Sequence, residues 1–379
     1  MTPTSRRTAA ASLAPAARRR ATALAGLALL LGAAILASPA QATESYALRY
    51  SPGIGGTDMT APLDPGWYGN VNLWIYEGKT KDGDGNTPRT TTAIGGPFSY
   101  TSTRDSTTRV RALLPRLTFI SSQQFLGATL GATVMLPLVE RENVVNISNT
   151  FTPGLESVPN LGNGTSGAQA IATINARSAA ASDNLTGNKF GIGDLELAPI
   201  MRWNHATGQV VFIPAVMLAT GDYKRTRLYN PGAGNFTTFR PTVQFNHIGD
   251  GWDFGMRLVY STNTRNSDTK YKSGDVFNLD FQVSKFVTDS VRLGLNGYVL
   301  QQVTDDKCNT ECQGLTVLGG VPGGEGNKGR VFGLGPAVGW IKDSGTLMVE
   351  GRVIKEFGAQ NRPEGTAVWL TIGAPLGSL

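Results

Sequence analysis

Alternation of apolar and polar residues recurs in about twelve segments of this 379-residue chain. The segment 191–203 is a clear example, because Leu195 and Trp203 share one parity whereas Asp194 and Glu196 share the other. A β-strand sends alternate side chains to opposite faces. Each such segment therefore predicts a strand with one apolar face and one polar face. In a membrane barrel, the apolar face meets lipid and the polar face lines the lumen.

The expected strands and their connections together predict a barrel. Five connections are short, namely 121–125, 204–208, 247–251, 287–290 and 342–345, and they alternate with six longer ones. This alternation is typical of an up-and-down barrel with short periplasmic turns and long extracellular loops. We therefore predict an all-β, transmembrane, antiparallel up-and-down β-barrel. Its twelve strands are expected at 67–76, 108–120, 126–138, 191–203, 209–219, 236–246, 252–262, 275–286, 291–302, 330–341, 346–356 and 366–374.

Three further features of the chain bear on the barrel. The region between Val139 and Phe190, rich in Asn, Ser, Thr and Gly, is expected to be a long loop. Aromatic residues cluster near the short turns, as an interfacial girdle requires. Prolines remove a ladder hydrogen bond, so we expect bulges where they fall inside the segments. These prolines are Pro115, Pro137, Pro199, Pro214, Pro241 and Pro336.

The N-terminus has the features of a secretory signal peptide. Arginines precede an apolar run at 21–37, and Ala40-Gln41-Ala42 has the small residues of a cleavage site. A membrane anchor is the alternative, although a run of this length is at the lower limit for a span. We expect residues 1–42 to be cleaved, residues 43–65 to form a periplasmic or lumen-plugging segment, and residues 66–379 to form the barrel.

The net charge gives no indication of a nucleic-acid partner. The formal charge is +6, but five arginines and no acidic residue lie in residues 1–42, which leaves +1 for the remainder. After the signal peptide there is no apolar run near 18 residues, so strands must make any membrane span.

The two cysteines lie close together in a polar stretch. Cys308 and Cys312 belong to the sequence CNTEC in an exported chain. A local disulfide is therefore expected between them. A metal site is the alternative, but no histidine lies near them in the sequence.

The lumen-facing parity of the predicted strands carries charges of both signs. These charges either pair across a filled lumen or form a polar constriction. The expected lumen or substrate-path residues are Arg116, Asp194, Glu196, Arg202, Arg240, Asp253, Arg257, Asp280, Arg292, Tyr298, Glu350 and Arg352.

The segment 209–219 differs from the others because both of its faces are apolar. Val211, Ile213, Ala215 and Met217 share the inward parity. Apolar surface facing water is unfavourable by about 25 cal/mol per Å². Either an inserted segment, such as 43–65, or an apolar ligand path should therefore cover this face.

Catalytic and cofactor motifs are not evident. His205 and His247 both fall in predicted periplasmic turns, whereas an outer-surface hydrolase needs its histidine near a serine at the other end. The DGDG sequence at 82–85 loosely resembles a calcium loop but lacks the full ligand run, and we interpret it as a solvated loop. We expect no enzyme activity, no catalytic or metal site and no cofactor.

Several short motifs resemble the outer-membrane proteins of the meta-pathway phenol-degradation family. They are GIGDLELAP at 191–199 with Trp203, TGDY at 220–223, YKSGD at 271–275, QVTDD at 302–306, GLGP at 333–336 and NRPEG at 361–365. Ala219 stands where the family usually has proline. The resemblance implies a channel-like barrel for aromatic or other apolar compounds.

These observations predict an outer-membrane channel for small apolar, mainly aromatic, compounds such as phenol-like degradation substrates. The expected partners are outer-membrane lipid, a small apolar or aromatic molecule and the barrel-assembly machinery, without nucleic acid. A structural or adhesive surface barrel with a closed lumen is the alternative. An outer-membrane hydrolase ranks third.

Overall fold

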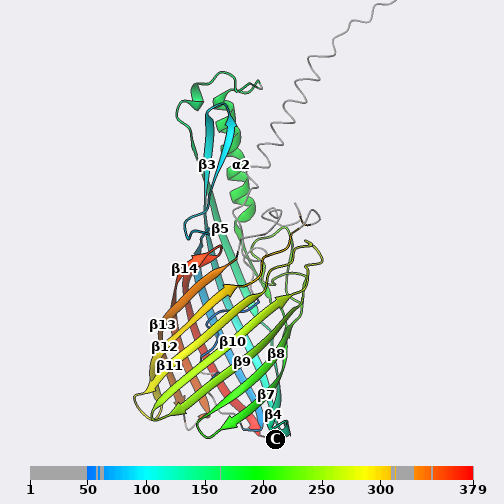
Figure 1. Ribbon diagram of the computed structural model, residues 1–379, viewed down its shortest axis with the longest axis vertical. Coiled ribbons are helices and arrows are strands. Elements are labelled where there is room, and N and C mark those ends of the chain that lie inside the picture. The colour runs from blue at the N-terminus through cyan, green and yellow to red at the C-terminus, as the bar shows by residue number, and fades with distance from the viewer. Residues whose placement is uncertain are drawn as a thin grey trace, which may run out of the picture.

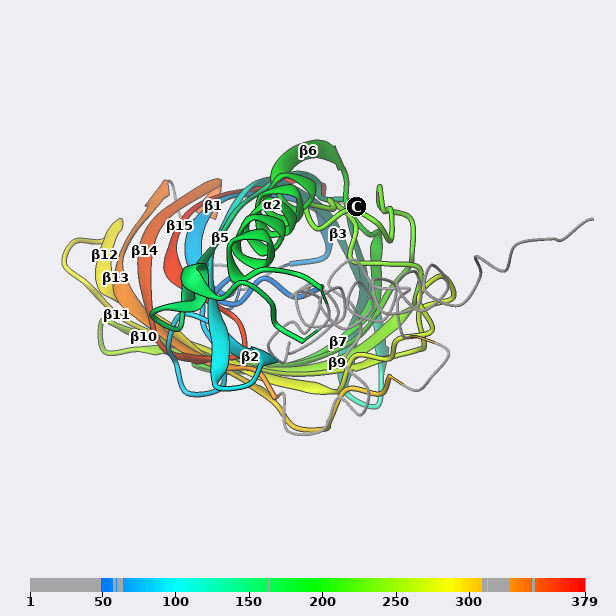
Figure 2. The ribbon, with the colours of Figure 1, turned by 90° about the horizontal axis from the view of Figure 1, so that it is seen from above.

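The computed structural model describes residues 49–56, 59, 64–162, 164–308, 312, 328–342 and 345–378. Its strands form one antiparallel sheet that closes on itself, because β1 pairs with both β3 and β15 (Figures 1 and 2). β4 and β5 are successive parts of one wall strand, and β6 and β7 are parts of another. The wall therefore has twelve antiparallel strands, which confirms the predicted barrel.

The strand boundaries agree closely with the sequence pattern over most of the barrel. The wall strands are β1 (Gly66–Thr80), β3 (Phe98–Phe125), β4 (Ala128–Met135), β5 (Leu138–Phe151), β6 (Gly187–Ile192), β7 (Glu196–His205), β8 (Gly208–Met217), β9 (Thr238–Gly249), β10 (Trp252–Asn263), β11 (Val276–Phe286), β12 (Val291–Gln302), β13 (Arg330–Lys342), β14 (Leu347–Gln360) and β15 (Pro363–Ser378).

Alternation places apolar side chains outside and polar ones inside. In β1, Val71, Leu73 and Ile75 are exposed on the outer face, whereas Asn72 and Tyr76 are buried. An outer surface of this composition suits lipid rather than water. The protein is therefore an outer-membrane β-barrel.

Exposed aromatic rings gather near the short turns. Trp67 packs on Phe119 with ring centroids 4.9 Å apart, and Trp252 stacks on Phe254 at 5.7 Å. The indole nitrogen of Trp203 donates a hydrogen bond to the carbonyl of Leu126 at 3.1 Å. These positions fit an interfacial girdle at the short-turn end.

The barrel wall is interrupted where two neighbouring strands break at the same level. Leu136 and Pro137 separate β4 from β5, and residues 193–195 separate β6 from β7. Across the break, the amide of Gly193 donates to the carbonyl of Pro137 at 2.7 Å. A Cβ at Gly193 would lie 2.8 Å from the Pro137 side chain, so this close approach requires glycine.

Five of the six prolines inside the expected strands are accommodated by missing ladder pairs, so the expectation of bulges was wrong there, whereas a bulge does occur at Pro137. β7 and β8 pair at Leu197–Val216 and at Met201–Phe212, with unchanged register and no pair between them around Pro199. No register shift falls at four others of the six, namely Pro115, Pro214, Pro241 and Pro336. A proline lacks the amide hydrogen, and at these five positions the ladder omits that bond without adding a residue. At Pro137 the register does shift, because the pairs Met135–Glu196 and Leu138–Ile192 leave two residues between them on one side and three on the other.

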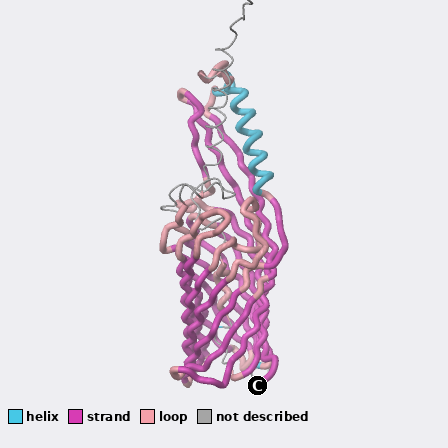
Figure 3. The backbone as a smooth tube through the Cα atoms, turned by 90° about the vertical axis from the view of Figure 1, so that its right-hand side faces the viewer, coloured by secondary structure: helices cyan, strands magenta, loops and turns pink. Residues whose placement is uncertain are grey.

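The region between Val139 and Phe190 is not a loop, which corrects the sequence-based expectation. It contains most of β5, a short helix η3 (Leu155–Ser157), an α-helix α2 (Gly167–Leu185) and the start of β6. β3 and β5 continue beyond the barrel, and β2 (Arg89–Gly95) pairs with β3 there (Figure 3). These elements form an extension at the end of the barrel opposite the short turns.

Helix α2 is held by its cap and by its buried face. Ser166 and Gln169 form a reciprocal capping box, which satisfies amide groups at the helix start. Ile174 packs against Tyr100 of β3, and Leu185 packs with Val145 of β5. None of the helices among the described residues is long and apolar enough to cross a membrane.

One connection expected to be long is short. β14 and β15 extend to Gln360 and from Pro363, so only Asn361 and Arg362 connect them. Asn361 adopts a positive φ of 52°, which asparagine tolerates in tight turns. The predicted signal peptide, residues 1–42, lies outside the described residues.

Candidate ligand cavity in the barrel lumen

The predicted lumen residues all lie on the inner side of the barrel wall. Most are almost fully buried, and Arg116 and Ile213 are partly buried. Most of them fall into two groups. Arg202, Glu350 and Arg352 lie toward the short turns, as do Asp253 and Arg292, whereas Arg116, Asp194, Glu196, Ile213, Met217, Arg240, Arg257 and Tyr298 line a cavity farther out.

Ion pairs fill the lumen near the short turns. Arg292 bonds to Asp253 and also contacts Glu350 at 2.8 Å, and Arg352 lies 3.4 Å from the same Glu350 carboxylate. Arg352 also donates to Thr371 at 3.0 Å. These charged groups are buried, so their side chains occupy this end of the lumen.

The described part of the N-terminal segment lies across the lumen beyond these ion pairs (Figure 2). The carboxylate of Asp280 accepts hydrogen bonds from the Tyr50 hydroxyl at 2.6 Å and from the amides of Gly53 and Gly55 at 3.1 and 3.0 Å. Arg352 donates to the carbonyl of Gly55 at 2.7 Å. Asp280 and Arg352 therefore hold this segment from two sides.

A cavity of about 180 Å³ lies between this segment and the barrel wall. On the wall side its lining comes from β1, β3, β4, β5, β7, β8, β9, β10, β12, β14 and β15, and on the other side from residues of the N-terminal segment that include Tyr50, Pro52 and Ile54. Most of the lining is apolar. The apolar wall residues are Trp74, Val110, Ala112, Leu114, Met135, Val139, Ile213, Ala215, Met217 and Ala367.

The apolar inward face of β8 thus borders the cavity, as well as the N-terminal segment. Ile213, Ala215 and Met217 line the cavity, and Arg49 donates to the carbonyl of Met217 at 3.2 Å. Val211 instead packs against Ile120 and Ile200. The N-terminal segment therefore meets this strand at Met217, and the cavity borders the strand from Ile213 to Met217.

Asp194 joins three parts of the chain at the outer side of the cavity. Its carboxylate accepts from Arg49 at 3.0 Å, from the amide of Gly221 at 3.0 Å and from the amide of Ala233 at 2.9 Å. Gly221 and Ala233 belong to the connection 218–237 between β8 and β9. Because this connection and Asp194 both line the cavity, Asp194 fixes its outer boundary.

A second pair of charges lies on the cavity wall beside Asp194. Glu196 and Arg240 form an ion pair at 2.6 Å, and both side chains are buried. Arg257 donates to the Gln244 side chain at 2.8 Å. The opposite charges of Glu196 and Arg240 therefore compensate one another within the wall.

Glu356 accepts hydrogen bonds from two tyrosines of the cavity. The hydroxyls of Tyr76 and Tyr298 each donate to it at 2.7 Å, and the amide of Gly365 donates to it at 2.7 Å. Arg362 lies 3.9 Å from the same carboxylate. All four side chains line the cavity, and all except Tyr298 were absent from the predicted set.

The sequence did contain a signal for the residues that were missed. Tyr76 shares the parity of Asn70 and Asn72, and Glu356 shares the parity of Glu350 and Arg352. Following these inward parities to the ends of β1 and β14 would have found both residues. Trp74 shares that parity too, but its apolar ring hides it in a search for charges.

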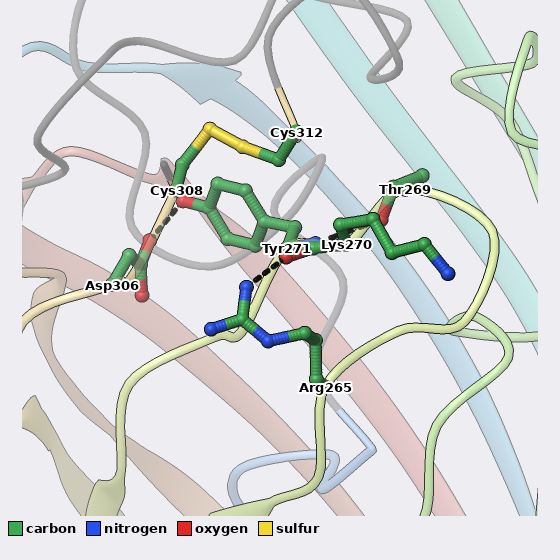
Figure 4. The surroundings of a disulfide bond; sticks show 7 residues. All are labelled: Arg265, Thr269, Lys270, Tyr271, Asp306, Cys308 and Cys312. Carbon is green, nitrogen blue, oxygen red and sulfur yellow. Dashed lines mark hydrogen bonds between the residues drawn. A yellow bond between two sulfur atoms is a disulfide. The ribbon is translucent and has the colours of Figure 1, made fainter. Parts of the chain in front are cut away.

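Cys308 and Cys312 form a disulfide in the connection between β12 and β13 (Figure 4). Tyr271 packs against both cysteines, and its hydroxyl donates to Asp306. Asp306 also accepts from the amide of Gly274 at 2.7 Å. The disulfide therefore belongs to a small cluster that joins two outer connections.

Among the described residues, no group of three or more His, Cys, Asp or Glu side chains is arranged to hold a metal ion.

Comparison with known proteins assigns the family. A family model described as "Putative MetA-pathway of phenol degradation" matches residues 79–372. The chain belongs to this family, which confirms the resemblance seen in its motifs. A search of the curated proteins finds no matching sequence.

The fold is similar to that of solved outer-membrane barrels. An outer-membrane channel from Pseudomonas putida F1 matches with a TM-score of 0.57 and 13% identity, covering 85% of this chain and 99% of that one. A mutant of the monoaromatic hydrocarbon channel TodX gives 0.38 and 10%, with 90% and 93% covered. A Pseudomonas aeruginosa FadL homologue gives 0.35 and 9%, with 83% and 91% covered. Only the first likeness is close enough to support the fold.

Proposed function

We propose that this outer-membrane protein is a channel that takes up small apolar, mainly aromatic, molecules. The observation that carries the proposal is the mostly apolar cavity of about 180 Å³ inside the lumen. An apolar protein cavity of roughly 150 Å³ is large enough to hold benzene. A monocyclic aromatic molecule therefore matches this space. The name of the first structural relative, a channel, is consistent with this assignment.

Because side chains fill the lumen at its short-turn end, a selective path is favoured over an open pore. Arg292, Glu350 and Arg352 fill the short-turn end, and the N-terminal segment crosses the lumen beyond them. Twelve strands also enclose less space than the sixteen or more of open porins. A solute would have to enter the cavity rather than diffuse through a continuous water column.

Substitution at Ala112 tests the proposal. This residue is 3% exposed and lines the cavity, so Ala112→Phe should fill much of the space that a ligand needs. Uptake of radiolabelled toluene by cells carrying only this variant should fall severalfold. Ala132 faces outward on β4, so Ala132→Phe is the matched control and should leave uptake unchanged. Equal uptake by the Ala112→Phe, Ala132→Phe and unchanged proteins would contradict the proposal.

A structural or adhesive surface role is the second candidate, and the extension favours it. β2, α2 and the outer parts of β3 and β5 project beyond the barrel and do not border the cavity (Figure 3). Excising residues 88–104 and 146–185, with short glycine-serine turns in their place, should leave toluene uptake intact if transport is the function. Loss of cell-surface adhesion with no measurable uptake by the unchanged protein would favour the adhesive role.

A further inference from the structure

Three tyrosines that line the cavity share one arrangement. The Tyr50 hydroxyl donates a hydrogen bond to Asp280, and the hydroxyls of Tyr76 and Tyr298 each donate one to Glu356. The carboxylates are almost completely buried, since Asp280 is 0% and Glu356 is 2% exposed. The same hydrogen bond, from a tyrosine hydroxyl to a buried carboxylate, thus occurs three times along the cavity lining. This repetition indicates that the arrangement has a chemical role at this site.

A tyrosine hydroxyl that donates its hydrogen bond to a carboxylate can act toward other groups only as an acceptor. The hydroxyl has one proton and two lone pairs, whereas an ionised carboxylate only accepts. A hydrogen bond from a neutral donor to a charged acceptor is stronger than one between two neutral groups. The hydroxyl hydrogen therefore stays directed at the carboxylate. Hydrogen bonds in a chain also polarise one another, which makes the phenolic oxygen a better acceptor.

The surroundings of Glu356 keep the hydroxyl hydrogens of Tyr76 and Tyr298 directed toward its carboxylate. Gly365 donates a third hydrogen bond to it, and the Arg362 guanidinium lies 3.9 Å away. The surrounding donors stabilise a carboxylate in this position. The two tyrosine side chains line the cavity, and their hydroxyl oxygens keep their acceptor capacity. Gly53 and Gly333 bring backbone against the Tyr298 ring, where a Cβ would lie 3.1 and 2.6 Å from its atoms, so the ring has little freedom to turn.

We propose that Glu356 is a specificity-determining positioning residue, which turns Tyr76 and Tyr298 into acceptors and makes the cavity prefer apolar aromatic ligands that carry an O–H or N–H donor. This inference rests on the proposed channel function and specifies its ligand class. Ligands whose polar group only accepts, such as aryl ethers, gain nothing from these two oxygens. Hydrocarbons fill the apolar part of the cavity and leave the polar end without a partner.

The arginines of the cavity do not affect the discrimination between a phenol and an aryl ether. Arg116, Arg141 and Arg240 also line it and can donate only. They serve a hydroxyl oxygen and an ether oxygen alike. A difference in affinity between a phenol and the corresponding ether therefore reports on the acceptors.

Binding to the purified full-length barrel in detergent micelles tests the inference. The probes are 4-fluorophenol, 4-fluoroanisole and 4-fluorotoluene, and fluorine NMR titration gives each dissociation constant. One net hydrogen bond corresponds to roughly a two- to tenfold change in affinity. We expect 4-fluorophenol to bind roughly three- to tenfold more tightly than 4-fluoroanisole, relative to the same ratio measured for empty micelles.

Variants assign that preference to named groups. Tyr76→Phe and Tyr298→Phe each remove one acceptor, and the double variant should bring the phenol-to-anisole ratio close to one. Glu356→Gln places an N–H donor where a carboxylate oxygen was, so one tyrosine hydroxyl no longer donates its hydrogen bond there. The phenol-to-anisole ratio should therefore fall, while 4-fluorotoluene binding stays constant. Tyr100→Phe is the matched control, because Tyr100 is equally buried but packs on Ile174 in the extension.

The outcomes separate the inference from the channel proposal. Equal binding of all three probes, or a ratio unchanged in the double variant, overturns the inference and leaves the channel proposal standing. A parallel loss of all three probes in Glu356→Gln shows a purely structural role and also overturns it. Binding of none of the probes to the unchanged protein contradicts the channel proposal itself.

Discussion

The two halves of the lumen are built from similar strands but are filled differently. Toward the short turns, Arg292, Asp253 and Glu350 form buried ion pairs that occupy the space between the walls. Farther out, β8 presents Ile213 and Ala215 to a cavity with a mostly apolar lining. Buried charges need partners and so pull side chains together, whereas apolar groups have no directional partner and can border empty space. We therefore expect closure of the lumen to depend on charge pairing, and ligand selection to depend on the half that contains the cavity.

The largest effect should follow from breaking the ion pairs of the closed half. Arg292→Met leaves the carboxylates of Asp253 and Glu350 buried without this guanidinium, and breaking a buried pair in this way costs about 3–5 kcal/mol. The free energy of unfolding in urea should fall by that amount.

An exposed ion pair provides the matched control for that change. Arg111 and Glu140 are 2.9 Å apart, and the Arg111 side chain is 59% exposed. Arg111→Met should cost less than about 1 kcal/mol, because solvent already screens the pair. Equal losses of stability for the two variants would show that burial does not distinguish the two positions.

The next effect concerns uptake rather than stability. Ile213→Asp places a carboxylate among the apolar side chains of β8, and desolvation of that carboxylate by a ligand costs several kcal/mol unless it is paired. Uptake of toluene should fall more than tenfold, and Ile213→Val should retain it. Barrel assembly should persist, because the lipid-facing side of β8 is unaltered.

Conductance of the same variant in planar bilayers distinguishes a ligand path from a permanent cover. If the N-terminal segment only seals β8, Ile213→Asp should loosen the segment and raise conductance to small ions. Unchanged toluene uptake together with raised conductance would refute a ligand path along β8.

The smallest effect should come from the disulfide. Cys308 and Cys312 close a very short loop, so the stabilisation should be below the roughly 3 kcal/mol expected for a fifteen-residue loop. Replacing both with serine should lower the unfolding free energy by about 2 kcal/mol or less and leave toluene uptake unchanged. A severalfold loss of uptake would instead connect this outer cluster to the cavity.

The barrel could be predicted from the sequence because its determinants are local and periodic. Alternation along a strand such as β12 (Val291–Gln302) specifies both faces at once, and the expected and observed boundaries of that strand are identical. The inner-facing charges followed from the same parity. Pairing between them did not, because Arg292 meets Asp253 and Glu350 only when β10, β12 and β14 are brought together in space.

The extension was missed for two physical reasons. β5 is polar on its outward parity and continues as a strand because β3 pairs with it over its whole length. Helix α2 did have a local signal, since Ser166 and Gln169 have the spacing of a capping box and precede an alanine-rich run. The surrounding Asn, Ser and Gly residues concealed that signal. The cavity itself depends on how the N-terminal segment crosses the lumen, which no local pattern specifies.

A crystal structure of the full-length protein soaked with bromobenzene tests the central claim most directly, because bromine is located by its anomalous scattering. The account predicts one strong bromine peak inside the lumen, within van der Waals contact of Ala112, Ile213 and Trp74, with the ion pairs around Arg292 unchanged. Bromine peaks confined to the lipid-facing surface, with the cavity lacking any, would contradict it.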